Sequence, residues 1–242
     1  MRPLAKRLGL LLPASNTTME RELMSFLPPG IGLHTSRMRI GPVTKDELIK
    51  MSKEAPKIAE AVNDCKPDVI LYGCTSGSFI LGKGFDVKLE EEVTAVTGVP
   101  TITTSHAVLN IANRLGLKKV AIGTPYAEEV NKPMRQFFTD NGLEITNFRG
   151  LGHLDNLDIG RLSPWEAVEL VKSIDSDDAE GIFLSCTNMQ TMEALVGMWE
   201  MFKKPVISSN FASMLEVLRM LGYPESNWLG MDLGEHLLRR YI

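Results

Sequence analysis

The chain carries one pattern twice, and this repeat constrains its fold more than any other feature of the sequence. Pro13 and Pro125 each end a matching apolar run, Cys74 and Cys186 each follow another, and both pairs lie 112 residues apart. A third match begins at Pro100, and its second copy lies 105 residues later. A pattern that occurs twice indicates two similar units rather than a long repeat array. The 242 residues therefore predict two related lobes.

Short apolar runs alternate with segments of helical periodicity along the chain. Continuous apolar runs such as residues 69–71 are typical of strands buried on both faces, as in a parallel sheet covered by helices. The predicted strands are residues 7–12, 32–35, 68–73, 101–103, 119–123, 144–148, 181–185 and 206–208. The predicted helices lie near residues 17–26, 45–63, 86–97, 105–115, 127–140, 164–174, 189–201 and 211–221. Pro56 and Pro133 fall inside two of these helices and should kink or split them.

This alternation predicts an α/β fold of two pseudo-symmetric lobes, each a roughly four-stranded parallel sheet flanked by helices. We assign residues 1–104, together with a closing C-terminal segment at 212–242, to the first lobe and residues 105–211 to the second. Ligands of open parallel sheets bind beyond the carboxyl ends of the strands. Cys74 and Cys186 both lie there, so we expect an active site in the cleft between the lobes, with one cysteine from each side.

Composition argues against several classes of protein. The formal net charge is −4 and the calculated pI is about 5.7, whereas nucleic-acid-binding proteins usually have a basic patch and a high pI. Three cysteines are too few, and odd in number, for a disulfide framework. The apolar run at residues 8–12 is shorter than a signal-peptide core, and no stretch approaches the ~18–20 apolar residues of a membrane span. We expect a cytoplasmic protein that binds neither nucleic acid nor membranes.

The two repeated cysteines are the strongest candidates for chemistry. Each follows a strand and precedes a turn, where backbone N–H groups converge; such a turn binds carboxylates and lowers a thiol pKa below its usual value of about 8.5. One thiolate could then act as base or nucleophile while the other thiol delivers a proton from the opposite face. A lone cysteine after a strand is more often a buried hydrophobic residue, but equivalent positions in a repeat favour function. Cys65 has no counterpart and is expected to be structural.

Other polar residues follow the strands. Asn16 could present its amide to a carboxylate, while Thr17 or Thr18 caps the next helix. Tyr126 could hydrogen-bond a substrate oxygen or simply pack against its neighbours. Asn156 is predicted to be a turn residue in a long connection. Neither repeated cysteine has Cys or His partners at metal-ligand spacing, so no metal site is predicted. The sequence also contains no Walker loop and no serine nucleophile elbow.

Several of these segments together resemble a known family. They are Ser-Asn-Thr-Thr-Met-Glu at 15–20, Ser-Arg-Met-Arg at 36–39, Thr-Pro-Tyr at 124–126, Asp-Asn-Leu at 155–157 and the two cysteine turns. Over nearly its whole length the chain resembles the maleate cis–trans isomerases of the aspartate/glutamate racemase superfamily. The resemblance implies two pseudo-symmetric lobes with the active site between them, a small carboxylate as substrate, no cofactor and a homo-oligomeric assembly.

The resemblance also implies roles for individual residues. Cys74, as a thiolate, would add to an olefinic carbon of maleate, and the new single bond could rotate before the thiolate leaves and fumarate forms. Cys186 would supply and retrieve the proton. The residues implied to hold the carboxylates are Asn16, Tyr126 and Asn156, with further donors from Thr75, Ser76, Thr187 and Asn188.

One segment differs from the maleate isomerase pattern. Small polar residues follow Cys74 in the segment 75–79, where maleate isomerases have bulky apolar ones. This segment is more similar to arylmalonate decarboxylase and to ectoine-utilisation relatives, although the decarboxylase keeps only the second thiol. The alternatives are therefore a two-thiol racemase or epimerase acting on an amino acid or an ectoine-like compound, an arylmalonate-type decarboxylase, and a non-catalytic binding protein for small acids.

Overall fold

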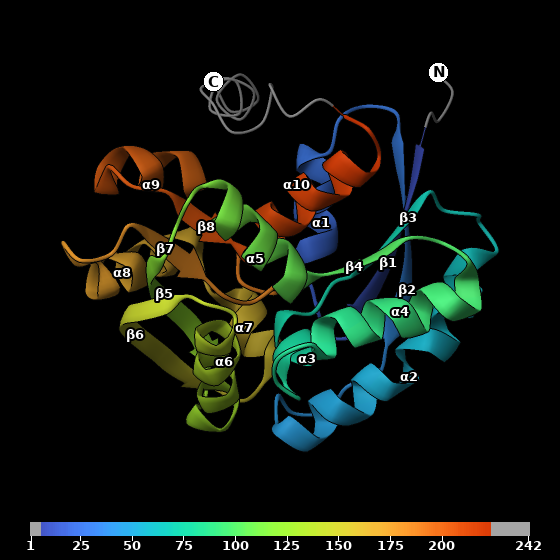
Figure 1. The fold of residues 1–242 in the computed structure, drawn as a ribbon, viewed down its shortest axis with the longest axis horizontal. Coiled ribbons are helices and arrows are strands. Elements are labelled where there is room, and N and C mark those ends of the chain that lie inside the picture. Colours follow the sequence, from blue (N-terminus) through green and yellow to red (C-terminus); the bar gives the residue numbers. More distant parts are fainter. Residues whose placement is uncertain (1–5, 224–242) are drawn as a thin grey trace.

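The structure is a computed structural model that describes residues 6–223, and these residues form two parallel sheets of four strands each (Figure 1). The first sheet has the order β2-β1-β3-β4, and the second has the same order in its own strands, β6-β5-β7-β8. The strands are β1 (Lys6–Pro13), β2 (Ile31–Met38), β3 (Val69–Tyr72), β4 (Thr101–Thr103), β5 (Lys119–Tyr126), β6 (Glu144–His153), β7 (Gly181–Leu184) and β8 (Val206–Ser208). The predicted α/β fold with two four-stranded parallel sheets is confirmed.

Helices flank both sheets. They are α1 (Met19–Phe26), α2 (Lys45–Asn63), α3 (Thr75–Phe79), α4 (Phe85–Thr97), α5 (Thr104–Arg114), α6 (Glu128–Asp140), α7 (Asn156–Arg161), α8 (Pro164–Ile174), α9 (Leu195–Phe202) and α10 (Ser209–Met220). α5 and α10 pack against each other between the two sheets (Figure 1). The proposed lobe boundaries stay a prediction, and residues 224–242 of the expected closing segment lie outside the described residues.

The helices differ from the prediction mainly in three places. α3 and α7 were not expected, and the helix expected from residue 189 begins only at Leu195. Pro56 and Pro133 were expected to kink or split their helices, and the split does not occur, because α2 and α6 each run unbroken through the proline. In α2 the face carrying Met51, Ala55 and Ala59 is buried along its whole length, and this packing outweighs the local cost of the proline.

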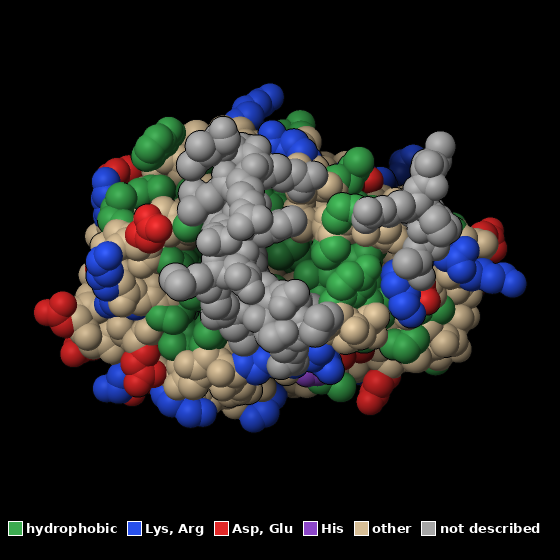
Figure 2. Space-filling view, turned by 90° about the horizontal axis from the view of Figure 1, so that it is seen from above, with side chains coloured by type: hydrophobic (Ala, Val, Ile, Leu, Met, Phe, Trp, Pro, Cys, Tyr) green, Lys and Arg blue, Asp and Glu red, His purple; other side chains and the backbone are tan. Residues whose placement is uncertain are grey.

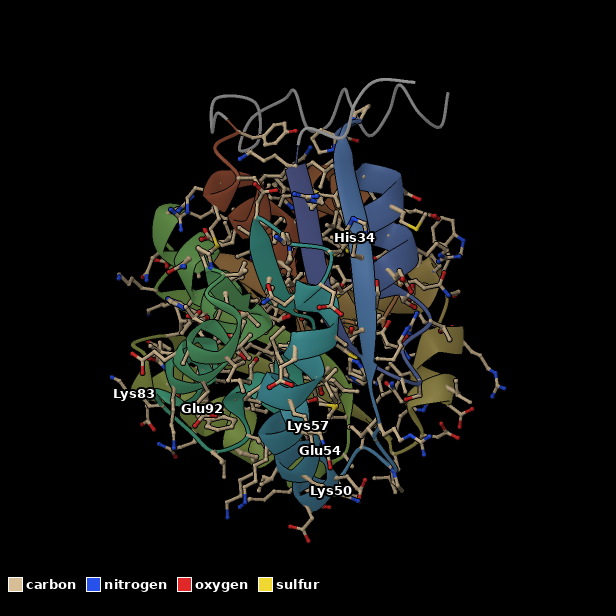
Figure 3. The ribbon with its side chains drawn as sticks, turned by 90° about the vertical axis from the view of Figure 1, so that its right-hand side faces the viewer. His34, Lys50, Glu54, Lys57, Lys83 and Glu92 are labelled. Atoms are coloured by element: carbon tan, nitrogen blue, oxygen red, sulfur yellow. The ribbon has the colours of Figure 1, made fainter. Side chains whose placement is uncertain are left out.

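α2 shows why these segments fold as surface helices. Figure 3 shows Lys50, Glu54 and Lys57 along its outward side, opposite the buried residues of the same helix. On the face seen in Figure 2, the Lys and Arg side chains of the described residues are scattered among Asp and Glu side chains around the edge. None of the helices within residues 6–223 combines the length and hydropathy needed to cross a bilayer.

An aromatic cluster fixes the two lobes against each other. Phe79, at the end of α3, has its ring centre 6.1 Å from that of Phe137 and 6.5 Å from that of Phe138, both on α6. Phe138 in turn packs edge-on against Phe183 of β7, at 5.3 Å. These rings are almost completely buried, and such aromatic packing resists displacement. The short helix α3 is therefore anchored to the second lobe although it follows a strand of the first.

A buried carboxyl group makes a second tie between the lobes. Glu22 of α1 accepts hydrogen bonds from the backbone N–H groups of Thr191 and Met192, at 2.8 and 3.1 Å. Its other oxygen accepts one from the side chain of Asn210, at 2.6 Å. Buried polar groups are tolerated when they are paired in this way, so α1, the connection after β7 and the start of α10 are held together.

The start of α5 is held by a carboxylate from α4. Glu90 accepts hydrogen bonds from the N–H and the hydroxyl of Thr103, at 2.7 and 3.0 Å, and both of its oxygens lie 2.9 Å from Nδ1 of His106. The hydrogen bond to Glu90 raises the pKa of His106 against the opposing effect of burial, and the negative charges of Glu90, Asp86 and Glu216 add to the rise.

This pair predicts a pH-dependent stability. Because the pKa of His106 is higher in the folded than in the unfolded chain, its stabilisation is complete below the unfolded value of about 6.5 and is lost as pH rises through the folded value. We expect the difference in free energy of unfolding between the protein and His106→Gln to shrink as pH rises from 6 to about 9, measured by denaturant titration. Glu90→Gln should remove most of this dependence. A difference that grows with pH would contradict the pairing.

Candidate active site

The two repeated cysteines lie at the carboxyl ends of β3 and β7, in turns of different shape. Cys74 is the N-cap of α3, and its Sγ accepts a hydrogen bond from the N–H of Gly77 at 3.3 Å, with the hydroxyl of Ser76 at 3.6 Å. Cys186 follows β7, and its Sγ accepts from the N–H of Asn188 at 3.4 Å. Both side chains are 5% exposed.

Both cysteines line one small cavity. Its lining is uncharged among the described residues and consists of Pro13, Asn16, Ile40, Val43, Leu48, Cys74, Thr75, Ser76, Tyr126, Asn156, Cys186 and Thr187. The cavity thus gathers eight of the nine site residues named from the sequence, and Asn188 is the exception. The apolar wall of Ile40, Val43 and Leu48 was missed. In the sequence, only Ile40 directly follows the Ser-Arg-Met-Arg segment.

Asn16 performs two tasks at the edge of the cavity. Its Oδ1 accepts the backbone N–H groups of Thr18 and Met19, both at 3.0 Å, and its Nδ2 donates to Oγ1 of Thr187, also at 3.0 Å. Thr18 is the N-cap residue of α1, as expected, but its side chain makes no capping hydrogen bond. The hydroxyls of Thr17 and Thr18 both donate to Asn188, and Asn16 supplies the oxygen that accepts the N–H groups at the start of the helix. The second hydrogen of the Asn16 amide has no partner among the described residues.

Asn188 ties the lobes together beside the cavity. Its Oδ1 accepts the backbone N–H of Thr17 at 2.8 Å, and its Nδ2 donates to the carbonyl of Asn156 at 2.5 Å. Asn156, at the start of α7, donates from its own Nδ2 to the hydroxyl of Ser15 at 2.8 Å. The contacts with Thr17 and with the Asn156 carbonyl occupy both the oxygen and the nitrogen of the Asn188 side-chain amide. The geometry therefore favours a positioning role for Asn188 over direct binding of a ligand.

Burial sets the protonation of the thiols. It raises the pKa of Cys74, and it raises the pKa of Cys186 to about 12, while hydrogen bonds from backbone N–H groups and from the Tyr126 hydroxyl act in the opposite direction. The expectation of a lowered thiol pKa is wrong, because the loss of water around the sulfur outweighs the converging N–H groups. Burial, and then the neighbouring Cys186, also raise the pKa of Tyr126 well above its usual value, so its hydroxyl remains a donor.

Comparison with known proteins gives the family. The family profile of arylmalonate decarboxylase matches residues 8–230. The chain belongs to the arylmalonate decarboxylase family. The maleate isomerase of Geobacillus stearothermophilus is 31% identical over 89% of this chain and 91% of its own length. The arylmalonate decarboxylase of Bordetella bronchiseptica is 29% identical over 88% and 86%.

The solved structures agree with this assignment. A cysteine-to-alanine variant of the maleate isomerase of Pseudomonas putida S16, crystallised with maleate, superimposes with a TM-score of 0.87 at 29% identity, over 90% of this chain and 93% of that one. The resemblance to maleate isomerases and to arylmalonate decarboxylase stated from the motifs is confirmed. Within residues 6–223, no three His, Cys, Asp or Glu side chains gather as a possible metal site.

The small residues that follow Cys74 have a structural cause in this member of the family. A Cβ atom on Gly77 would overlap the Tyr72 hydroxyl and would lie 3.2 Å from Sγ of Cys74. That hydroxyl is held 3.0 Å from the hydroxyl of Ser52, which also donates to the Gly77 carbonyl at 2.8 Å. Tyr72 therefore occupies the space that a larger side chain at position 77 would need.

This packing predicts the effect of a methyl group. Gly77→Ala should destabilise the protein by ~1–3 kcal/mol through overpacking, and Tyr72→Phe should recover part of that loss because it removes the overlapping hydroxyl. The control is Gly197→Ala in α9, where a Cβ would meet no atom within 4 Å. Denaturant unfolding measures all three. Equal stability of Gly77→Ala and the parent protein would contradict the packing.

The raised thiol pKa predicts how the cysteines react with iodoacetamide. Only the thiolate is alkylated. The alkylation rate at Cys74 should therefore still rise with pH above the pH at which the alkylation rate of free glutathione levels off. The rate at Cys186 should rise further still, because its pKa is about 12. Peptide mass spectrometry at each pH separates the sites. A rate at either cysteine that levels off below about pH 8 would show that the turn dominates over burial.

Proposed function

We propose that this protein is a cofactor-independent isomerase that converts maleate to fumarate with two cysteines. The observation that carries the proposal is one cavity, uncharged in its described lining, to which each lobe contributes a thiol, Cys74 and Cys186. Its similarity to maleate isomerases over most of the chain supports the same reading. A buried inert cysteine would have no reason to line the same cavity as its repeat partner.

Donor groups in the cavity suit a substrate with two carboxylates. A charge moved from water into a protein interior is stable only when hydrogen bonds replace its hydration. The amide of Asn16, the hydroxyl of Tyr126 and the hydroxyl of Ser76 can provide such bonds, and the apolar wall of Ile40 and Val43 can contact the carbon atoms. Asn156, Thr75 and Thr187 complete the proposed binding set, and Asn188 positions it.

The reaction needs an addition and an elimination. The Cys74 sulfur forms a bond to one olefinic carbon, the π electrons move toward the other carbon and its carboxylate, and Cys186 gives that carbon a proton. Rotation about the resulting single bond follows; Cys186 takes the proton back and the carbon–sulfur bond breaks. Because the described lining holds no basic side chain, a substrate carboxylate would accept the initial proton of Cys74 and return it when the carbon–sulfur bond breaks.

Two other activities remain as alternatives with distinct signatures. A two-thiol racemase or epimerase would exchange the α-hydrogen of its substrate with solvent and form no carbon–sulfur bond. An arylmalonate-type decarboxylase needs only the second thiol, and the thiol at Cys74 therefore favours the isomerase. A cytoplasmic location and a homo-oligomeric assembly stay predictions from composition and resemblance.

The proposal predicts the turnover of three cysteine variants. We expect reduced protein to convert maleate to fumarate, followed by proton NMR, and Cys74→Ser and Cys186→Ser each to lose at least about 10³-fold in kcat. Cys65→Ser is the matched control and should retain its activity, because Cys65 lies outside the cavity. A folded, reduced protein that leaves maleate unchanged would remove maleate as the substrate. Deuterium uptake at the α-carbon of an amino acid would then favour the racemase.

A further inference from the structure

Cys186 has a backbone conformation that side-chain-bearing residues rarely adopt. Among the described residues, three other than glycine have positive φ: Lys66 and Lys203 at 48° and 55°, within the ordinary left-handed region, and Cys186 at 126°, outside it. Cys74, at the equivalent place in the repeat, has φ of −146°, which is extended backbone. A strained residue persists only where its surroundings hold it, so some contact present in the second lobe must do so.

The contact is the hydroxyl of Ser209, the first residue of α10. The N–H of Cys186 donates to Oγ of Ser209 at 3.0 Å, and Oγ1 of Thr75 lies 2.8 Å from the same Oγ. Ser209 has no exposed surface and is not among the residues that line the cavity. One buried hydroxyl therefore joins the turn of Cys186 to the residue that follows Cys74.

The repeat shows that this arrangement is particular to the second lobe. Ser209 corresponds to Thr104 at the offset of 105 residues found in the sequence. The hydroxyl of Thr104 donates to the carbonyl of Tyr72 at 3.0 Å, and the N–H of Cys74 bonds to that same carbonyl, also at 3.0 Å. In the first lobe the N–H of the cysteine is thus satisfied within its own strand, whereas in the second lobe it is satisfied by a helix hydroxyl.

We propose that Ser209 is a positioning residue for the proton transfer by Cys186. Its hydroxyl stabilises the strained turn and fixes the Cys186 sulfur relative to the Cys74 turn, through Thr75. This role rests on the proposed function, because it matters to turnover only if Cys186 exchanges a proton with the substrate. A displacement of about 1 Å in a reacting group costs up to ~10²-fold in rate, which makes such a support consequential.

The test combines kinetics with an amide readout that does not need turnover. Selective ¹⁵N labelling of cysteine gives one amide signal each for Cys65, Cys74 and Cys186. In Ser209→Ala we expect hydrogen exchange at the Cys186 amide to accelerate at least about fivefold while the Cys74 amide is unchanged. With maleate, kcat should fall ~10–100-fold and KM should change less than about threefold.

The control is Ser213→Ala in the same helix. Ser213 is also fully buried, and its hydroxyl bonds to Thr104 at 3.3 Å rather than to either cysteine turn. We expect this variant to keep both the Cys186 exchange rate and kcat.

Three results would overturn the proposal: unchanged exchange at Cys186 in Ser209→Ala, equal acceleration at all cysteine amides, or selective acceleration with unchanged kcat. If the unsubstituted protein does not turn over maleate, the proposed function fails, and the amide data still report separately whether Ser209 holds the turn.

Discussion

A hydrogen bond across the cleft joins the two cysteine turns directly, and the proposed chemistry depends on the geometry that it fixes. The hydroxyl of Thr187, next to Cys186, donates at 3.0 Å to the carbonyl of Gly73, next to Cys74. A second bond, from Asn16 to the same threonine hydroxyl, adds the first strand's turn to this contact. The aromatic cluster around Phe79 and the buried Glu22 hold the surrounding elements. The two sheets are thereby fixed with their strand ends at one cavity.

The electrostatics of this cavity are as important as its shape. Among the described residues its walls carry no charged side chain, and both thiols are kept neutral by burial. The substrate would bring the charge, and fixed amide and hydroxyl dipoles would stabilise that charge as it moves during addition and elimination. In this arrangement a thiol need not be a thiolate before binding. The raised thiol pKa is therefore compatible with the proposed reaction, although it reverses the expectation from the turn geometry.

Much of the architecture could be predicted from the sequence because the repeat is an explicit constraint. The proline pair Pro13 and Pro125 and the cysteine pair Cys74 and Cys186 have the same spacing of 112 residues, which predicted two similar lobes. The apolar runs located all eight strands that the structure describes. α3 was missed because four small residues followed by one phenylalanine have no periodicity to detect, and the helix is stabilised by its cap and by Phe79. The bond from Asn16 to Thr187 and the tie made by Asn188 depend on contacts between residues 171 positions apart in the chain, which no local pattern contains.

The sign of the thiol pKa shift could not be predicted for a similar reason. It depends on how completely the second lobe covers a turn of the first.

The covalent role of Cys74 is the central claim of this account, and intact-protein mass spectrometry of Cys186→Ser mixed with maleate tests it most directly. The account predicts an added mass of one maleic acid, located at Cys74 by peptide mapping and absent when Cys74 is also replaced by serine. A fully unmodified protein, or an adduct that forms only at Cys65, would contradict it.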